Sequence, residues 1–306
     1  MERAEAVDNV VDETRWTHRS HAMVWLAVVV AACLVAAADG RQEWLARWGG
    51  RSGAIPYESL VLLSLALGCE FIDATIGMGY GTTLTPVLLL LGYPVGVIVP
   101  CAVLSQLSGN ISAAFFHHRF GNVDFLRDGK ARNAAFVIGG IGLAVAAVTV
   151  LLAVRLPPEV LKLGVSMSII GVGVFLLARS RFKATFRLRN MAVLGAFAAF
   201  NKAFSGGGYG PLVCGGQVLA GLEVRAAVGT TAVAEAMVCA STAMAYFVSG
   251  AGLAHGVLFP LTAGSLLSTP ASAMVLRRIP APLARKLMGV AVLLLGVLAL
   301  LKVTNG

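Results

Sequence analysis

The chain has 306 residues, of which 58% are hydrophobic and 13% are charged, and its formal net charge is +9. A soluble domain carries roughly twice that share of charged residues, because its surface must be covered by polar groups. Composition therefore excludes a soluble domain, a secreted disulfide scaffold and a disordered chain, and it indicates an integral membrane protein. The basic charge does not predict nucleic-acid binding, since the 24 Lys and Arg lie almost entirely in short gaps between apolar runs.

The apolar runs predict the transmembrane segments in chain order. About 20 apolar residues cross a bilayer as a helix, and the candidate runs lie at roughly 22–38, 57–91, 95–116, 133–154, 159–178, 190–220, 226–249, 257–276 and 283–303. We expect residues 1–21 to form a cytosolic tail, and 22–56 an extra N-terminal transmembrane helix with a linker. The run 22–38 ends in three alanines, so a cleaved signal peptide is the alternative. A retained helix is favoured, because the tail before it is long and not clearly basic.

Two runs, 57–91 and 190–220, are too long for one span, and each is interrupted by glycine. The letters GMGYG at 77–81 match GGGYG at 206–210 at an offset of 129. This repeat predicts a first half at 57–178 and a second at 190–306, joined by a basic cytosolic loop at 179–189. Each half would be a broken segment followed by three transmembrane helices. Broken helices in equivalent positions of two halves are typical of secondary transporters.

The distribution of Lys and Arg predicts how the halves are oriented. If every segment crosses the membrane once, these residues divide almost evenly between the two sides. If both broken segments are re-entrant and leave on the side where they enter, most lie on the side of the N-terminal tail, as the positive-inside rule requires. The second arrangement gives three true crossings in each half, so the halves would be inverted relative to each other. The predicted fold class is an all-α polytopic membrane protein built from two inverted repeats.

The glycine segments also resemble a known family. The letters EFIDATIGMGYGTTLTP at 70–86, HHRFGNVD at 117–124, SGGGYGP at 205–211 and AVGTT at 227–231 are similar to signatures of the TauE/SafE family of membrane transporters. The resemblance extends from about residue 57 to the C-terminus. It implies transport of an anion, with sulfite, sulfonates and related sulfur compounds as the usual cargo. Glu70 and Asp73 depart from the family pattern, in which many members have apolar or small residues there.

The glycine breaks are candidate substrate sites. Backbone N–H groups outside the helical ladder are tolerated at membrane depth where they line a cavity or are buried in protein, and helix N-termini attract anions. The alternative is that the glycines only allow close helix packing, but two copies at a fixed offset favour a substrate site. The expected substrate-binding residues are Gly79, Tyr80, Gly81, Thr82, Lys202, Ser205, Gly207, Gly208, Tyr209, Gly210 and Thr230.

Four ionisable residues lie inside apolar runs: Glu70, Asp73, Lys202 and Glu235. An unpaired charge at the bilayer centre costs about 2.5–3.5 kcal/mol on insertion scales, so these groups should pair, face water or titrate. Asp73 and Lys202 are separated by the repeat offset, and so are Gln106 and Glu235. We expect Asp73 to pair with Lys202, either as a structural lock between the halves or as the resting partner of a substrate-binding lysine. Glu235 could carry a proton, and the expected coupling group is Glu70, Asp73, Glu235 and Gln106.

Together these features predict a permease that moves a small anion by alternating access in the bacterial cytoplasmic membrane. The competing classes are an intramembrane enzyme using Ser205 with His255, and a non-transporting assembly subunit. No His-Glu-x-x-His zinc motif is present, and no gap between spans is long enough for an effector domain. We expect no enzyme activity, cofactor, metal or nucleic-acid partner. Membrane lipid and the anion are the expected partners, and a homodimer is left open.

Overall fold

The computed structural model describes residues 57–178, 187–250 and 253–276, with scattered helical positions between 290 and 301. Over these residues the regular structure is helical: α2 (Tyr57–Ile76), α3 (Tyr80–Leu90), α4 (Val95–Arg119), α5 (Gly129–Ala153), α6 (Pro158–Ala178), α7 (Leu188–Ser205), α8 (Tyr209–Leu219), α9 (Val224–Val248) and α10 (His255–Val275). The expected span at 22–38 and most of the basic loop at 179–189 lie outside the described residues. The expected span at 283–303 is described only at the scattered positions.

Both overlong runs are broken where the sequence predicts. Helix α2 ends before Gly77, whose φ is 74°, and α7 ends before Gly206, whose φ is 73°. This left-handed backbone conformation is readily available only to glycine. The helices that follow each break have equal lengths in the two halves, since α3 and α8 have 11 residues each and α4 and α9 have 25 each. The repeat seen in the sequence therefore corresponds to a repeated order of helices, with equal lengths after each break.

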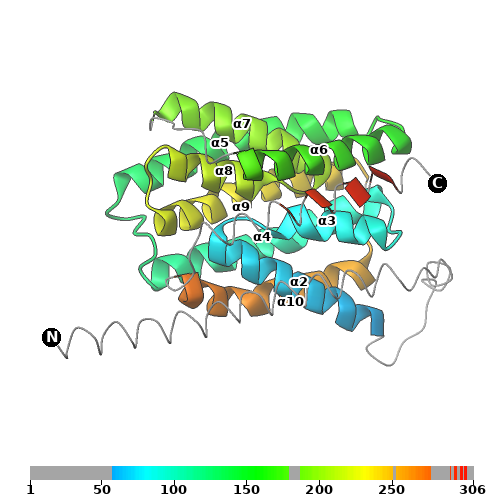
Figure 1. Cartoon of the computed structure of the whole chain (residues 1–306), viewed down its shortest axis with the longest axis horizontal. Helices are drawn as coiled ribbons and strands as arrows, with labels where there is room; N and C mark the ends of the chain where they lie inside the picture. The colour runs from blue at the N-terminus through cyan, green and yellow to red at the C-terminus, as the bar shows by residue number, and fades with distance from the viewer. Residues whose placement is uncertain are drawn as a thin grey trace.

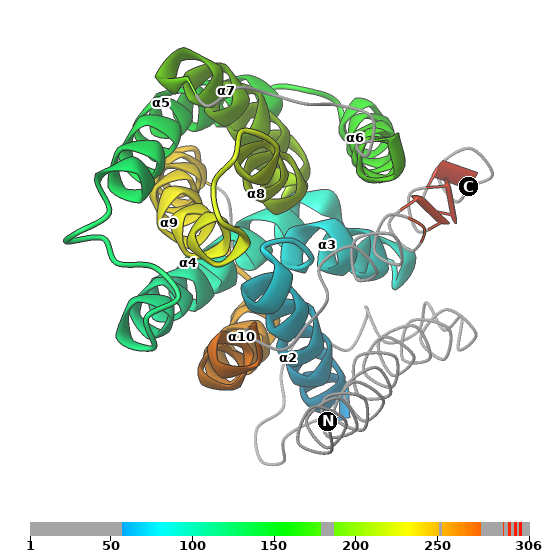
Figure 2. The ribbon, with the colours of Figure 1, turned by 60° about the vertical axis from the view of Figure 1, so that its left-hand side comes forward.

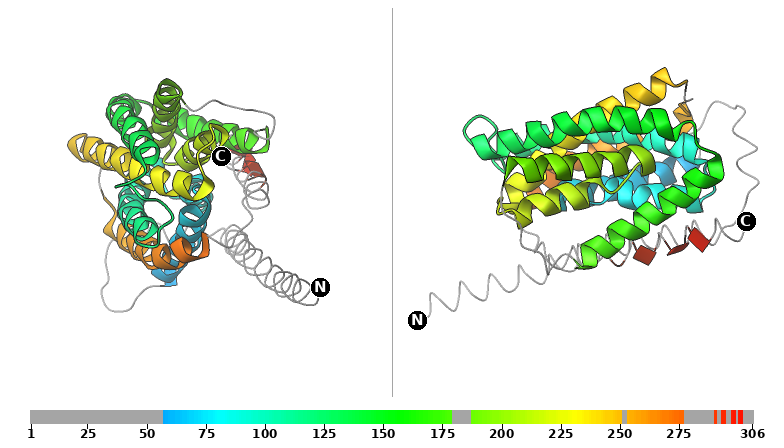
Figure 3. Two further views of the ribbon diagram at one scale, coloured as in Figure 1. Left: turned by 90° about the vertical axis from the view of Figure 1, so that its left-hand side faces the viewer. Right: turned by 90° about the horizontal axis from the view of Figure 1, so that it is seen from above.

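The two halves are interlocked. Helix α2 packs against α10, and α7 packs against α5, so the first helix of each half lies on a helix of the other half. Helices α4 and α9 pack on each other between these pairs, and α6 lies to one side (Figures 1 and 2). Figure 3 shows the same helices from one end and from above. Polar side chains on the middle of these helices are consequently enclosed by protein.

The helices are apolar outside and partly polar inside, as expected in lipid. Five are long and apolar enough to cross a membrane, judged by length and composition over the described residues: Glu58–Ile76, Val95–Arg119, Gly129–Ala153, Val224–Val248 and His255–Val275. Large apolar side chains such as Phe115, Phe197 and Phe247 are exposed on their surfaces. The ionisable residues Glu70, Asp73, Lys202 and Glu235 are buried instead. The chain is therefore a multi-pass membrane protein in which the ionisable groups in the middle of the helices face the interior of the protein.

The crossing of α5 and α7 should depend on a glycine. A Cβ added at Gly195 would lie 2.7 Å from the carbonyl oxygen of Ile138, whereas one added at Gly140, on another face of α5, would meet nothing within 4 Å. We expect Gly195→Ala to lower the stability of the detergent-purified protein by about 1–3 kcal/mol, because overpacking forces helices apart. Gly140→Ala is the control. Thermal unfolding followed by size-exclusion chromatography measures both, and equal melting temperatures would contradict the close crossing.

Candidate functional site

The first break is held by a carboxylate from the helix before it. The N-terminal N–H groups of a helix have no partner within that helix. Oδ1 of Asp73, in the last turn of α2, accepts a hydrogen bond from the Tyr80 N–H at the start of α3 at 3.2 Å. The Tyr80 hydroxyl is hydrogen-bonded to Ser105 Oγ of α4 at 2.7 Å. The break is thus fixed at its main chain and docked on α4.

The second break is held differently. The N–H of Gly206 donates to the carbonyl of Lys202 at 2.8 Å, and Asn201 Nδ2 donates to the carbonyl of Gly207 at 3.1 Å. Ser205 Oγ donates to the carbonyl of Asn201 at 2.7 Å. Lys202 occupies the position equivalent to Asp73, but its side chain has no oxygen with which to cap a helix. The break therefore lacks the carboxylate that organises the first one.

The two breaks touch each other through their main chains. A Cβ added at Gly81 would lie 2.7 Å from Cα of Gly207, and one added at Gly210 would lie 3.0 Å from Cα of Met78. Any side chain at these positions would force the halves apart. Three of the expected substrate-binding glycines, Gly81, Gly207 and Gly210, are therefore brought together at the junction of the halves. Close packing is sufficient to explain glycine at Gly81, Gly207 and Gly210, and substrate binding by these residues stays a prediction.

A buried network of charged and polar side chains lies beside this junction. Lys202 Nζ is 3.1 Å from Glu235 Oε1, and it also donates to Gln106 Oε1. Gln106 Nε2 donates to Glu235 Oε1 at 3.0 Å and to Asp73 Oδ2 at 3.5 Å. Lys202 is fully buried, and Glu235 is only 2% exposed. The network joins α2, α4, α7 and α9, and so connects both halves.

The repeat offset marks the residues of this network but does not give their pairing. Gln106 and Glu235, which occupy equivalent positions 129 residues apart, are hydrogen-bonded to each other. The direct ion pair expected between Asp73 and Lys202 is not formed among the described residues; Lys202 pairs with Glu235, and Gln106 bridges to Asp73. The reason is that α4 and α9 cross at the centre. Their side chains come between the residues at the two breaks.

Glu70 is enclosed but stands outside the network. It is 1% exposed, and neither of its carboxyl oxygens has a hydrogen-bond partner. A Cβ added at Gly109 of α4 would lie 2.8 Å from its Cδ, and that Cβ would also meet Oγ of Ser265 on α10. Ser265 Oγ likewise has no partner. The carboxyl group of Glu70 and the hydroxyl group of Ser265 therefore both lie next to Gly109, where α2, α4 and α10 pack together.

The remaining expected residues have structural contacts. Thr230 Oγ1 donates to Gln217 Oε1 at 2.8 Å, which ties α9 to α8. Ser205 is bonded within its break. His255 begins α10 with its ring 5.7 Å from that of Phe259, and no hydrogen bond joins it to Ser205 in the described chain. The candidate nucleophile and base of an intramembrane enzyme are thus not assembled.

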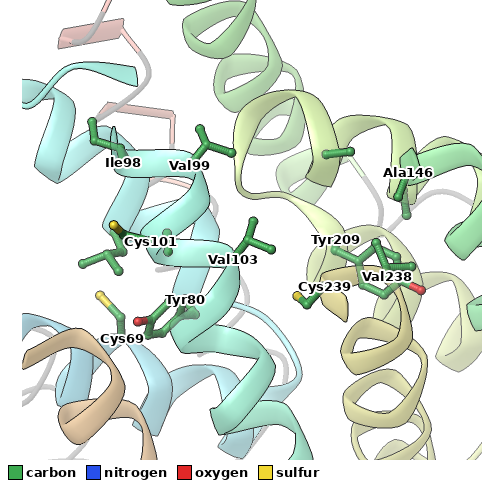
Figure 4. Packing of buried hydrophobic residues seen from close by; sticks show 14 of the residues in the cluster. Cys69, Tyr80, Ile98, Val99, Cys101, Val103, Ala146, Tyr209, Val238 and Cys239 are labelled. Carbon is green, nitrogen blue, oxygen red and sulfur yellow. The ribbon is translucent and has the colours of Figure 1, made fainter. Parts of the chain in front are cut away.

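Two features of the site were missed from the sequence. Tyr80 is bonded to Ser105, whereas the buried hydroxyl of Tyr209, its counterpart, has no partner. The offset explains this, because the position equivalent to Ser105 is Ala234. Figure 4 shows Tyr80 near Cys69, and Tyr209 near Val238 and Cys239. Comparing the two halves residue by residue would have shown that Ser105 is replaced by Ala234, whereas the lack of a partner for the Tyr209 hydroxyl is known only from the structure.

Within the described ranges, no group of three His, Cys, Asp or Glu side chains is placed to hold a metal ion. What the residues assemble is a buried ion pair beside two broken helices, inside a multi-span α-helical protein. Broken helices and buried charges at mid-depth are the features that membrane transporters use to bind substrates and coupling ions. The fold and site therefore define a membrane transporter.

Comparison with known proteins identifies the family. The sequence profile described as "Sulfite exporter TauE/SafE" matches residues 60–299, and the chain belongs to this family of membrane transporters, which are not enzymes. The chain is also 28% identical over 234 residues to "Probable membrane transporter protein YtnM" of Bacillus subtilis (strain 168). That alignment covers 72% of this chain and 75% of the relative.

The network should make the loss of one charge worse than the loss of both. Removing one partner of a buried ion pair typically costs about 3–5 kcal/mol, because the other charge is left behind. We expect Lys202→Gln and Glu235→Gln each to destabilise the purified protein more than the double variant does. A double-mutant cycle in thermal unfolding measures this coupling. Additive losses would show that the pair does not interact, and the same cycle with Asp73→Asn and Lys202→Gln should give weaker coupling.

Proposed function

We propose that the protein moves a small anion across the bacterial cytoplasmic membrane by alternating access, with sulfite, a sulfonate or a related sulfur compound as cargo. The observation that carries this proposal is the buried ammonium group of Lys202 beside both helix breaks. Attraction between opposite charges is stronger in a low-dielectric interior than in water. The family description, which names sulfite export, supports a sulfur oxyanion as the cargo.

The contacts of Lys202 suggest how an anion would bind. In the described state its ammonium group is shared between Glu235 and Gln106 and is closed to solvent. An incoming anion would replace the Glu235 carboxylate at Nζ, once the halves separate enough to admit it. In the described arrangement Glu235 is the resting partner of Lys202, and both groups are closed to solvent.

The two halves are proposed to be inverted repeats that rock against each other. The distribution of basic residues supports opposite orientations, with the loops at 119–132 and 179–189 cytosolic and the loop at 155–162 outside. The packing between the halves supports a pseudo-two-fold arrangement, because it is reciprocal: α2 of the first half packs on α10 of the second, and α7 of the second half packs on α5 of the first. In such an arrangement a binding site near the axis is opened to either side by movement of one half.

Inversion can be tested at one pair of equivalent positions. Pro94 precedes α4 and Glu223 precedes α9; they are 129 residues apart, and both are exposed. We introduce Pro94→Cys and Glu223→Cys separately into a cysteine-free chain. In intact cells a membrane-impermeant maleimide should label only Pro94→Cys, and Glu223→Cys should react after the cells are opened. Labelling of both from the same side would contradict inversion.

Anion transport is tested with purified protein in liposomes, to which sulfite, thiosulfate and a short sulfonate are offered. We expect Lys202→Gln to lower the uptake rate at subsaturating substrate about tenfold or more, because loss of a charge-assisted contact is worth at least about 1.4 kcal/mol. Lys130→Gln is the matched control, since Lys130 is exposed at the start of α5. Flux of a cation that survives Lys202→Gln, with no anion moved, would refute the proposal.

A further inference from the structure

Glu70 and Ser265 form a closed polar site that the ion-pair network does not use. Both residues are buried, and neither the carboxyl oxygens of Glu70 nor the hydroxyl of Ser265 has a hydrogen-bond partner. They approach the same glycine, Gly109, from two different helices. The ammonium group of Lys202 could pair with a carboxylate, but it is already bound to Glu235 and Gln106.

The second half shows that packing at this crossing needs no carboxyl group. The positions equivalent to Glu70 and Gly109 are Ala199 and Val238, and both are buried. They pack on α5, where a Cβ added at Gly142 would lie 2.6 Å from Cγ2 of Val238 and 3.2 Å from Cβ of Ala199. Apolar groups thus fill the corresponding space. The second half therefore has no group equivalent to the carboxyl group of Glu70.

A buried carboxylate that has only one hydroxyl group beside it and no cation of its own is unfavourable, because its charge has lost more water contacts than this single group can replace. A bound proton removes that charge and turns the group into a hydrogen-bond donor, for which the Ser265 hydroxyl is an acceptor over the same glycine. We propose that Glu70 is the proton-binding site of this transporter, and that its proton moves in the same direction as the anion. The coupling part of this inference rests on the proposed anion transport.

The electrostatic surroundings give the direction of coupling. Glu70 lies one helical turn before Asp73 on α2, and the titratable groups that face it from α2, α3, α7 and α9 are Cys69, Asp73, Tyr80, Lys202, Glu235 and Cys239. The neighbouring residues of α4 and α10, Gly109 and Ser265, carry no charge. An ionised Glu70 would add a third carboxylate around one ammonium group. A neutral Glu70 leaves the surroundings of Lys202 less negative.

Protonation of Glu70 should therefore favour binding of an anion at Lys202, because it removes a like charge from the site. Linkage is reciprocal, so a bound anion favours the proton to the same extent. Since Glu70 is closed to water in the described state, the proton can enter or leave only when the halves open to one side. Proton and anion would then be taken up from one side and released together on the other.

The first experiment reads the proton directly and needs no substrate. A protonated carboxylic acid has an infrared C=O stretching band that a carboxylate lacks. We expect the difference spectrum between the purified chain and Glu70→Gln at neutral pH to contain this band. The corresponding difference for Glu235→Gln should contain carboxylate bands instead. A Glu70 difference with carboxylate bands only, or with carboxylate bands that shift when sodium is added, would overturn the proposal.

The second experiment measures binding of a short sulfonate, whose own charge does not change between pH 5 and pH 8. We expect affinity for the full chain to rise as pH falls, and Glu70→Gln, which resembles the protonated state, to bind with little dependence on pH. Glu70→Ala, which places the residue of the second half at this position, should behave in the same way. Agreement between the two variants would show that the effect comes from the lost charge and not from the amide group of glutamine.

The outcomes separate the two proposals. If no sulfur anion binds to the full chain, anion transport is wrong, and the infrared band still decides whether Glu70 holds a proton. If the anion binds but Glu70→Gln keeps the pH dependence of the full chain, the coupling role of Glu70 is wrong while anion transport stands. In liposomes, Glu70→Gln should still exchange labelled anion for unlabelled anion, but it should lose accumulation driven by a pH gradient.

Discussion

At Gly81 and Gly207 the main chains of two broken helices are in contact, and a single methyl group on either residue would separate them. This contact brings Asp73 and Lys202, which lie just before the two breaks, to the centre of the molecule. It also places them beside α4 and α9, whose Gln106 and Glu235 complete the network. The polar interior thus depends on a backbone contact that only glycine permits.

Lipid offers no polar groups to a buried charge, so the protein must supply the partners itself. Lys202 has two acceptors, and Gln106 uses both its oxygen and its nitrogen. Against this background, the carboxyl group of Glu70 and the hydroxyl of Tyr209 are two of several buried polar groups without a hydrogen-bond partner. Buried polar groups without partners are costly in any protein, and here they lie close to the residues that we assign to transport.

The differences between the two halves are more informative about function than their similarity. The repeat conserves the lengths of α3 and α8, of α4 and α9, and the glycine at each break. It changes Asp73 to Lys202 and Glu70 to Ala199. The equal helix lengths and the glycines at the breaks form the scaffold that the two halves have in common. The unequal residues place a positive charge at one break and a carboxyl group near the other, and we infer that this asymmetry is used to bind an anion and a proton together.

The sequence by itself determined the membrane class, most of the spans, the two breaks and the equivalence of Gln106 with Glu235. Hydrophobic length and glycine act locally, and a repeat offset identifies residues in equivalent positions of the two halves. Only the tertiary structure decided that Lys202 pairs with Glu235 rather than Asp73, that Gly81 and Gly207 pack on each other, and that Glu70 is enclosed with Ser265. The offset specifies equivalence between halves, but which atoms touch depends on how helices distant in sequence cross and on how far each side chain reaches.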